Sequence, residues 1–190
     1  MSAKVAIVAG AAGALGHAMT VTLAASGLTV VAVDRNERGL GDLPASVRRE
    51  VADTTDPAAA KGLIDRIASE VGPPDVLVNT IGAFRLADAL TTTPETLRLM
   101  IDVNLGTALW LSQAVALHMR QQGSGVIVHV TARPGIEPSG GMAAYSVSKA
   151  ALVHLTRVLD VELRPHGIRV NAVAPQLLDS CKPGPRARPR

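Results

Sequence analysis

The stretch that decides the fold is residues 5–16, which read VAIVAGAAGALG. Its first five residues form an apolar run typical of a buried strand, and the run ends in a turn that carries Gly10, Gly13 and Gly16 before a helical pattern begins. A strand, a glycine-rich turn and a helix in this order let the backbone approach a pyrophosphate at the positive end of the helix. The stretch therefore predicts a dinucleotide-binding turn.

The rest of the chain alternates between short apolar runs and longer helical patterns. Further strands are expected at 28–33, 47–51, 75–79, 126–130 and 168–173. Helices are expected at 14–26, 56–71, 94–122 and 143–164. This alternation predicts one α/β domain over residues 1–180, with a Rossmann-type, doubly wound parallel sheet of six strands and helices on both faces.

Composition excludes several classes of protein. Of the 190 residues, 47% are apolar and 2% aromatic, so the core must be aliphatic, and a nucleic-acid reader that stacks bases on aromatic rings is excluded. The net charge of +3 originates in residues 181–190, a Pro- and Arg-rich tail without acidic residues that we expect to be disordered. We expect no nucleic-acid partner.

Nothing in the sequence indicates export, a membrane or a metal. No targeting segment precedes the first strand, and no uninterrupted apolar stretch has the length of a membrane span. A lone cysteine, Cys181, permits no internal disulfide, and the five histidines lack metal-ligand spacing. We expect a soluble, cytoplasmic protein without a metal site or a membrane partner.

Asp34 ends the second apolar run, 24 residues after Gly10. A carboxylate at this place hydrogen-bonds the hydroxyls of an adenosine ribose and repels a 2′-phosphate. Asp34 therefore favours NAD over NADP. Arg35 next to it keeps NADP open, because a guanidinium can accept that phosphate.

Tyr145 and Lys149 are spaced to share one face of the helix at 143–164. A nearby ammonium favours the phenolate and lowers the pKa of the phenol toward working pH, which a general acid/base for hydride chemistry requires. Tyr145 is the only tyrosine of the chain. The alternative interpretation is an exposed helical pair without a catalytic role.

With these motifs the chain resembles the short-chain dehydrogenase/reductase family from about Lys4 to Ser180. The resemblance implies a proton relay made of Asn104, Tyr145 and Lys149, with Asn104 ordering a water. It also implies a nicotinamide cofactor that binds at Gly10, Ala12, Gly13, Leu15, Gly16, Asp34, Asp53, Asn79, Gly82, Tyr145, Lys149 and Pro175.

Two departures from the family pattern bear on activity. Ala132 stands 13 residues before the tyrosine, where the family has its catalytic serine, and Thr131 beside it would point to the opposite face of a continued strand. Members similar to dihydropteridine reductase also lack this serine. The chain further resembles a C-terminally truncated member, because the family continues through another helix and a seventh strand.

The expected function is hydride transfer between NAD, or less favourably NADP, and a small carbonyl, alcohol or cyclic imine, with Tyr145 exchanging the proton. Two alternatives stay open: a dinucleotide-binding protein with little or no catalysis, and a truncated product without a function of its own. The resemblance also implies a homodimer formed through the two long helices, 94–122 and 143–164.

Overall fold

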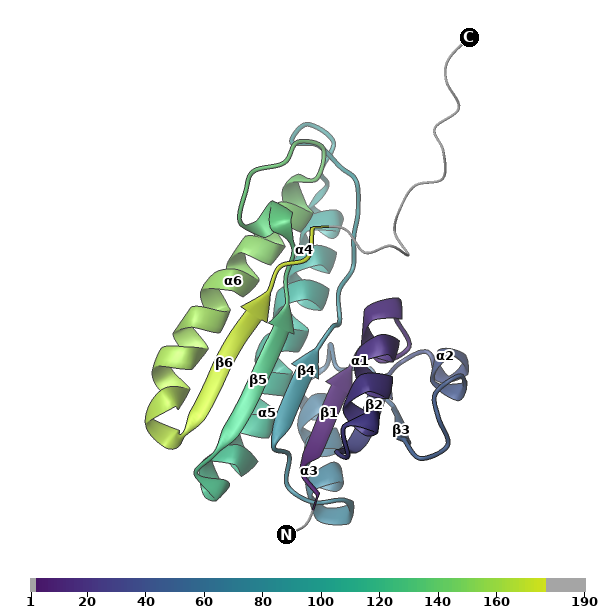
Figure 1. Cartoon of the computed structure of the whole chain (residues 1–190). Helices are drawn as coiled ribbons and strands as arrows, with labels where there is room; N and C mark the ends of the chain where they lie inside the picture. The colour runs from purple at the N-terminus through teal and green to yellow at the C-terminus, as the bar shows by residue number, and fades with distance from the viewer. Residues whose placement is uncertain (1–2, 177–190) are drawn as a thin grey trace.

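The computed structural model describes residues 3–176, which form a six-stranded parallel sheet with strand order β3-β2-β1-β4-β5-β6 (Figure 1). The strands are β1 (Val5–Ala9), β2 (Thr29–Asp34), β3 (Arg48–Val51), β4 (Val76–Asn79), β5 (Gly125–Val130) and β6 (Ile168–Val173). Each predicted strand is present, and the bounds differ from the prediction by at most one residue at each end. The prediction of a Rossmann-type sheet is confirmed.

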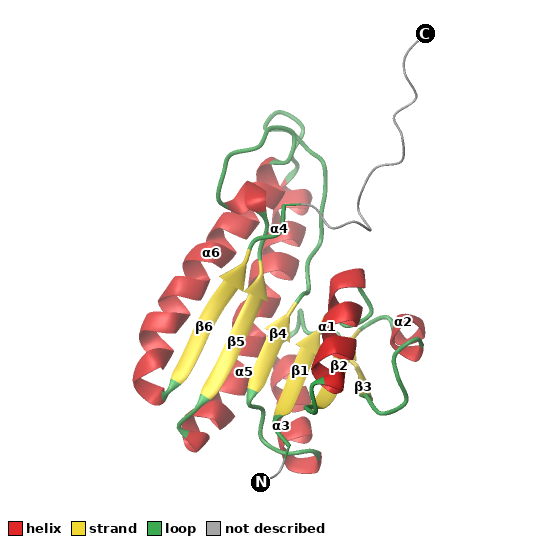
Figure 2. Ribbon diagram, viewed as in Figure 1, coloured by secondary structure: helices red, strands yellow, loops and turns green. Residues whose placement is uncertain are grey.

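Helices lie on both faces of the sheet (Figure 2). They are α1 (Ala14–Ala25), α2 (Glu37–Gly41), α3 (Pro57–Glu70), α4 (Pro94–Ile101), α5 (Thr107–Gln122) and α6 (Ala143–Leu163). One buried cluster joins the sheet to α3, α5 and α6, and a second joins it to α1 and α2. Within residues 3–176 the second face is covered mainly over β1 and β2.

Local signals explain where several helices begin. The Asp56 carboxylate accepts hydrogen bonds from the backbone N–H groups of Ala58 and Ala59, and Pro57 opens α3, as an acidic cap followed by proline predicts. The short helix α2 was not expected. Asn36 caps it, and the side-chain oxygen of Asn36 accepts from the Gly39 N–H.

The helix predicted over 94–122 is one continuous helix, in which a π-helical turn, Asp102–Gly106, joins α4 to α5. By length and composition it is apolar enough to cross a membrane, yet half of its most apolar part is buried inside the fold. Such burial is typical of the core helix of a water-soluble domain. The π turn was not predicted, because its extra residue has no counterpart in hydrophobic periodicity.

The strand order reverses between β1 and β4, and this reversal fixes where a ligand can bind. Parallel strands end at the same edge of the sheet, and the crevice at the switch point is the usual ligand site of such sheets. Gly10, Asp34 and Gly82 lie at or just after the ends of β1, β2 and β4 on this edge. The tail expected to be disordered, 181–190, lies outside the described residues.

Candidate active site

The glycine turn after β1 is built by close backbone approach. Gly10 has φ +82°, and a Cβ there would lie 2.6 Å from Thr80 Oγ1 and 2.9 Å from the Ile81 nitrogen. A Cβ on Gly16 would overlap with the carbonyl oxygen of Gly10. These two glycines are therefore required by packing between β1, α1 and the β4 end. Gly13, the N-terminal cap of α1, meets only the Gly10 oxygen at 3.4 Å, so its missing side chain leaves the helix end open.

Thr80 closes the turn from the neighbouring strand. Its hydroxyl lies 2.8 Å from the carbonyl oxygen of Ala9 and 3.1 Å from that of Gly10. Sequence reasoning assigned Thr80 no role. The available signal for a role of Thr80 was its position immediately after a strand end. The two carbonyl groups that its hydroxyl contacts are at least 70 residues away in the sequence, so no local pattern indicated this contact.

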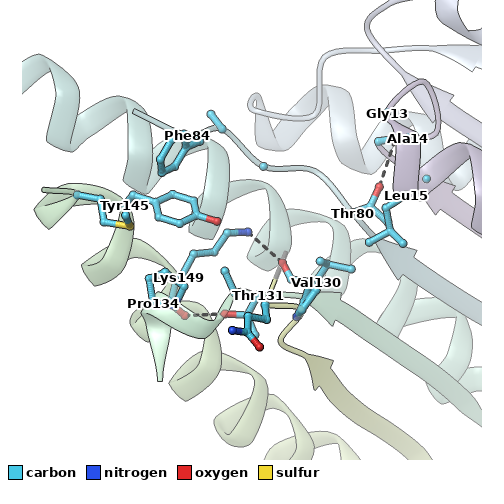
Figure 3. A pocket seen from close by; sticks show the side chains of 18 residues that line it. Gly13, Ala14, Leu15, Thr80, Phe84, Val130, Thr131, Pro134, Tyr145 and Lys149 are labelled. Atoms are coloured by element: carbon cyan, nitrogen blue, oxygen red, sulfur yellow. Dashed lines mark hydrogen bonds between the residues drawn. The ribbon is translucent and has the colours of Figure 1, made fainter. Parts of the chain in front are cut away.

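Two cavities meet at this edge of the sheet. The larger, of about 620 Å³, extends from the glycine turn to α6 (Figure 3). The smaller, of about 250 Å³, lies over the ends of β2 and β3. Ten of the predicted site residues line one or both cavities: Gly10, Gly13, Leu15, Gly16, Asp34, Asp53, Gly82, Tyr145, Lys149 and Pro175. The three others, Ala12, Asn79 and Asn104, lie behind the walls and act on residues that form them.

Asp34 is held in place by the backbone at the smaller cavity. One carboxylate oxygen accepts from the Ala12 N–H at 3.0 Å, and the other accepts from the Asn36 N–H at 2.9 Å. Ala12, predicted to contact the cofactor, therefore contributes by orienting Asp34. A carboxylate fixed beside the glycine turn can accept hydrogen bonds from the hydroxyls of a ribose.

Asp53 lies on the same cavity wall. The backbone N–H and the hydroxyl of Thr55 both donate to its Oδ1, at 3.0 and 2.7 Å. These hydrogen bonds hold the pKa of the Asp53 carboxyl below its usual range, so it is a fixed anion at neutral pH. Arg35 and Arg85 also line this cavity, which therefore carries both signs of charge.

Asn79 is buried at the end of β4, where its side-chain oxygen accepts from the Ile81 N–H at 3.1 Å. It shapes the turn that leads to Gly82. Gly82 is the part of this segment that faces the cavities. A Cβ on Gly82 would lie 3.2 Å from both Asn104 Oδ1 and Lys149 Nζ, so both atoms lie against the side of Gly82 on which a side chain would project.

Asn104 lies within the π turn and is fully buried. Its Oδ1 accepts from the Ala83 N–H at 2.8 Å, and its Nδ2 donates to the Ala83 carbonyl at 3.0 Å. Nδ2 also donates to Ser148 Oγ at 2.9 Å. Asn104 thus joins the π turn to the segment after β4 and to α6.

Tyr145 and Lys149 project from the first turns of α6 into the larger cavity, with the phenol and the ammonium directed toward the same space (Figure 3). The Phe84 ring packs edge-on against the Tyr145 ring, with centroids 4.8 Å apart and planes at 89°. Lys149 is 4% exposed, and its Nζ donates to the Val130 carbonyl at 2.9 Å. Burial lowers the pKa of the Lys149 ammonium to about 8.

Ala132 places a methyl group on the wall of the larger cavity. The Thr131 hydroxyl beside it donates to the Lys149 carbonyl at 3.1 Å and is buried. The expectation that Thr131 does not replace the missing serine therefore agrees with this contact. The remaining wall at this end of the cavity is largely apolar and includes Phe84, Pro134 and Met142. Residues 3–176 contain no group of three or more potential metal-ligating side chains.

The chain is similar to known proteins in both sequence and fold. A family model described as short chain dehydrogenase matches residues 4–182. The short-chain reductase protein NovJ of Streptomyces niveus is 37% identical over 179 residues, which are 90% of this chain and 68% of that protein. The crystal structure of a short-chain dehydrogenase from Streptomyces avermitilis superposes with a TM-score of 0.87 at 31% identity over 92% of this chain and 65% of its own. NAD⁺-bound xylitol dehydrogenase superposes with a TM-score of 0.88 at 31% identity, covering 91% of this chain and 70% of its own.

Proposed function

The chain belongs to the short chain dehydrogenase family, and from this premise we propose that it is an NAD(H)-dependent oxidoreductase that acts on a small molecule. The chain covers roughly two thirds of the length of the relatives described above. Their individual activities are therefore not transferred to it. The proposal depends instead on the residues that surround the two cavities.

A single observation carries the proposal: one cavity contains both the glycine turn and the Tyr145–Lys149 pair. Its volume, about 620 Å³, lies within the usual range of small-molecule sites. The open N-terminus of α1 suits the pyrophosphate of a dinucleotide, because the backbone N–H groups there carry partial positive charge. A dinucleotide bound along this edge would extend from Asp34 toward Tyr145.

NAD(H) is the preferred cofactor in this proposal. The anchored carboxylate of Asp34 suits a ribose with two free hydroxyls and repels a 2′-phosphate. Arg35 and Arg85 are the features that favour NADP(H), since a guanidinium on the same wall can bind a phosphate. Two backbone N–H groups hold the Asp34 carboxylate in one orientation, whereas the two arginines are known only to line the cavity. NAD(H) is therefore favoured.

When bound, the nicotinamide supplies or accepts a hydride at the substrate carbon. In the direction of reduction, Tyr145 gives its proton to the oxygen or nitrogen that was doubly bonded to that carbon, so that one hydride and one proton, together two electrons and two protons, reach the substrate. The Lys149 ammonium favours the resulting phenolate by its charge. Asn104 holds the segment after β4 beside Lys149 and positions the water of the relay.

Ala132 favours a second candidate function, a dinucleotide-binding protein with weak or no catalysis. The methyl group cannot donate to a substrate carbonyl, and the neighbouring Thr131 hydroxyl is engaged with the Lys149 carbonyl. Loss of such a donor costs about 10²–10³ in rate for reactions that develop an oxyanion. A cyclic imine depends less on this donor, because its more basic nitrogen develops no oxyanion.

Calorimetric titration with NADH and with NADPH tests the cofactor part of the proposal, and turnover of a panel of small ketones and cyclic imines tests the activity. We expect micromolar binding of NADH, weaker binding of NADPH, and turnover that Tyr145→Phe abolishes while NADH affinity is retained. If neither cofactor binds, the proposal is rejected. NADH binding without turnover of any substrate selects the second candidate.

A further inference from the structure

Ser148 connects residues assigned to the proton relay through its hydrogen bonds. Its position in the sequence and its burial did not by themselves indicate such a role. It lies between Tyr145 and Lys149 on α6 and is fully buried. We propose that Ser148 is a positioning residue that sets the Asn104 side chain against α6 and thereby tunes the Tyr145–Lys149 pair. This inference rests on the proposed function.

The Ser148 hydroxyl is engaged on both sides. It accepts from Asn104 Nδ2 at 2.9 Å and donates to the Tyr145 carbonyl at 2.8 Å. These bonds link two side chains that are 44 residues apart in the sequence, and they end on the backbone of the residue that carries the phenol. A buried hydroxyl with both functions satisfied restrains its partners more than an exposed one does.

The contact determines where the Asn104 carboxamide sits relative to Lys149. Both Nδ2 hydrogens have partners, Ala83 and Ser148, while Oδ1 accepts from Ala83. The side of Gly82 on which a Cβ would lie is bordered by Asn104 Oδ1 and Lys149 Nζ, each 3.2 Å from that position. In this proposal, the Asn104 carbonyl dipole held on this side favours the ammonium, and the ammonium favours the phenolate.

Other charged groups around the pair are few. Among the described residues that line the larger cavity, Tyr145 and Lys149 are the only ones with titratable side chains. The charge of Lys149 acts on the buried imidazole of His129 in β5, and Arg133, in the turn after β5, pairs with Glu137. Lys149 is therefore the one titratable neighbour of Tyr145 on the described wall of this cavity.

The chain supplies its own matched control. Ser146 lies two residues before Ser148 on α6, and its Oγ is also buried but has no hydrogen-bond partner among residues 3–176. Ser146→Ala and Ser148→Ala remove the same atom from the same helix. Only the second removes the contact with Asn104.

Because Tyr145 is the only tyrosine, the absorbance of its phenolate reports its ionisation directly. In Ser148→Ala the Asn104 dipole is less restrained, the ammonium loses its proton more readily, and the phenol ionises at higher pH. We expect the apparent pKa of Tyr145 to rise by about 0.5–1 unit, which corresponds to the loss of roughly one hydrogen bond. We expect Ser146→Ala to titrate as the wild type does.

Turnover gives the second readout. Ser148→Ala should lower kcat about tenfold and shift its pH profile in the same direction as the phenol, with the KM for NADH unchanged. In an Asn104→Ala background Ser148→Ala should have no further effect on the phenol, because the contact is already lost. Fluorescence of Trp110, the only tryptophan, checks the fold, and Ser148→Cys replaces Ser148→Ala if the latter does not fold.

A lower melting temperature in Ser148→Ala with an unchanged phenol titration would overturn the inference, because a merely structural role predicts that result. The phenol titration needs no substrate and so separates the two proposals. A shifted phenol in a protein without turnover keeps the role of Ser148 and rejects the proposed activity. Turnover with an unshifted phenol keeps the activity and rejects the role of Ser148.

Discussion

At the substrate end of the larger cavity, Ala132 offers a methyl group where the family pattern has a hydroxyl. Ala132 is 7% exposed and lies on the cavity wall, so a serine there would add one oxygen next to open space. The hydrogen bonds from the Thr131 hydroxyl to the Lys149 carbonyl and from Lys149 Nζ to the Val130 carbonyl would not change, because neither involves the side chain at position 132.

We predict that Ala132→Ser raises kcat/KM for small ketones about tenfold or more, since one oxyanion donor contributes about 10²–10³ where it is well aligned. For cyclic imines the same substitution should change kcat/KM by less than about threefold, because their reduction develops no oxyanion. Parallel assays of both substrate classes with NADH measure the difference. An equal gain for the two classes would contradict the assigned role of position 132.

His129 carries a second prediction at the scale of a single residue. It is fully buried in β5, with Nε2 3.2 Å from Ser112 Oγ, and its Nδ1 has no partner among the described residues. Burial, with the charge of Lys149 as a second cause, lowers the pKa of the imidazole to about 4. The imidazole is therefore neutral in the folded chain and takes a proton when the chain unfolds below about pH 6.5.

This difference makes the folded state less stable in acid. The full stability is present above about pH 6.5 and falls as the pH decreases toward 4, by about 1.4 kcal/mol per pH unit in the middle of that window. Urea unfolding at several pH values measures the slope. His129→Gln should flatten it, whereas His154→Gln, on the exposed side of α6, should not. Equal slopes for the wild type and His129→Gln would exclude His129 as the cause.

At the scale of an element, the turn between β1 and α1 depends on the close approach of two backbone segments more than on side-chain contacts. Gly16 lies in the first turn of α1, and a Cβ there would overlap the Gly10 carbonyl oxygen. A shift of α1 away from β1 would also move the helix N-terminus that is proposed to bind the pyrophosphate.

We predict that Gly16→Ala destabilises the fold by about 1–3 kcal/mol, as overpacking does, and weakens NADH binding at least tenfold. Gly62→Ala in α3 is the control: no atom lies within 4 Å of its Cβ, and alanine there should stabilise the chain by about 0.5–1 kcal/mol. Chemical unfolding and calorimetric titration give the two quantities. Wild-type behaviour of Gly16→Ala would contradict the packing argument.

At the scale of the whole molecule, we propose a homodimer formed through the outer surfaces of α4, α5 and α6. Large apolar side chains on these helices are at least one third exposed, among them Leu97, Leu117, Val147, Val158 and Val161. A surface that buries such side chains against a second copy gains stability from the hydrophobic effect.

Sedimentation at micromolar concentration should show a dimer for the wild type, and Val161→Asp should shift it toward the monomer by placing a charge in the contact. Val51→Asp, on β3 at the opposite edge of the sheet, introduces the same charge at an exposed valine and should remain dimeric. A monomeric wild type would reject the dimer.

Local sequence patterns predicted the six strands, the longer helices, the glycine turn and the spacing of Tyr145 and Lys149. Each of these depends on residues close together in the chain, through the periodicity of 2 or 3.6 residues and the conformational freedom of glycine. The predicted strands consequently match the structure within one residue, and ten of the predicted site residues line the cavities.

Interactions between residues far apart in the sequence emerged only from the packing of the fold. Ala12 orients Asp34 across 22 residues, Thr80 closes the turn at Gly10 across 70, and Ser148 holds Asn104 across 44. The burial that lowers the pKa of Lys149 also arises from the packed α6 and β5 rather than from its neighbours in sequence. These contacts have no local period or spacing, because each depends on where the sheet and helices bring two separate segments together.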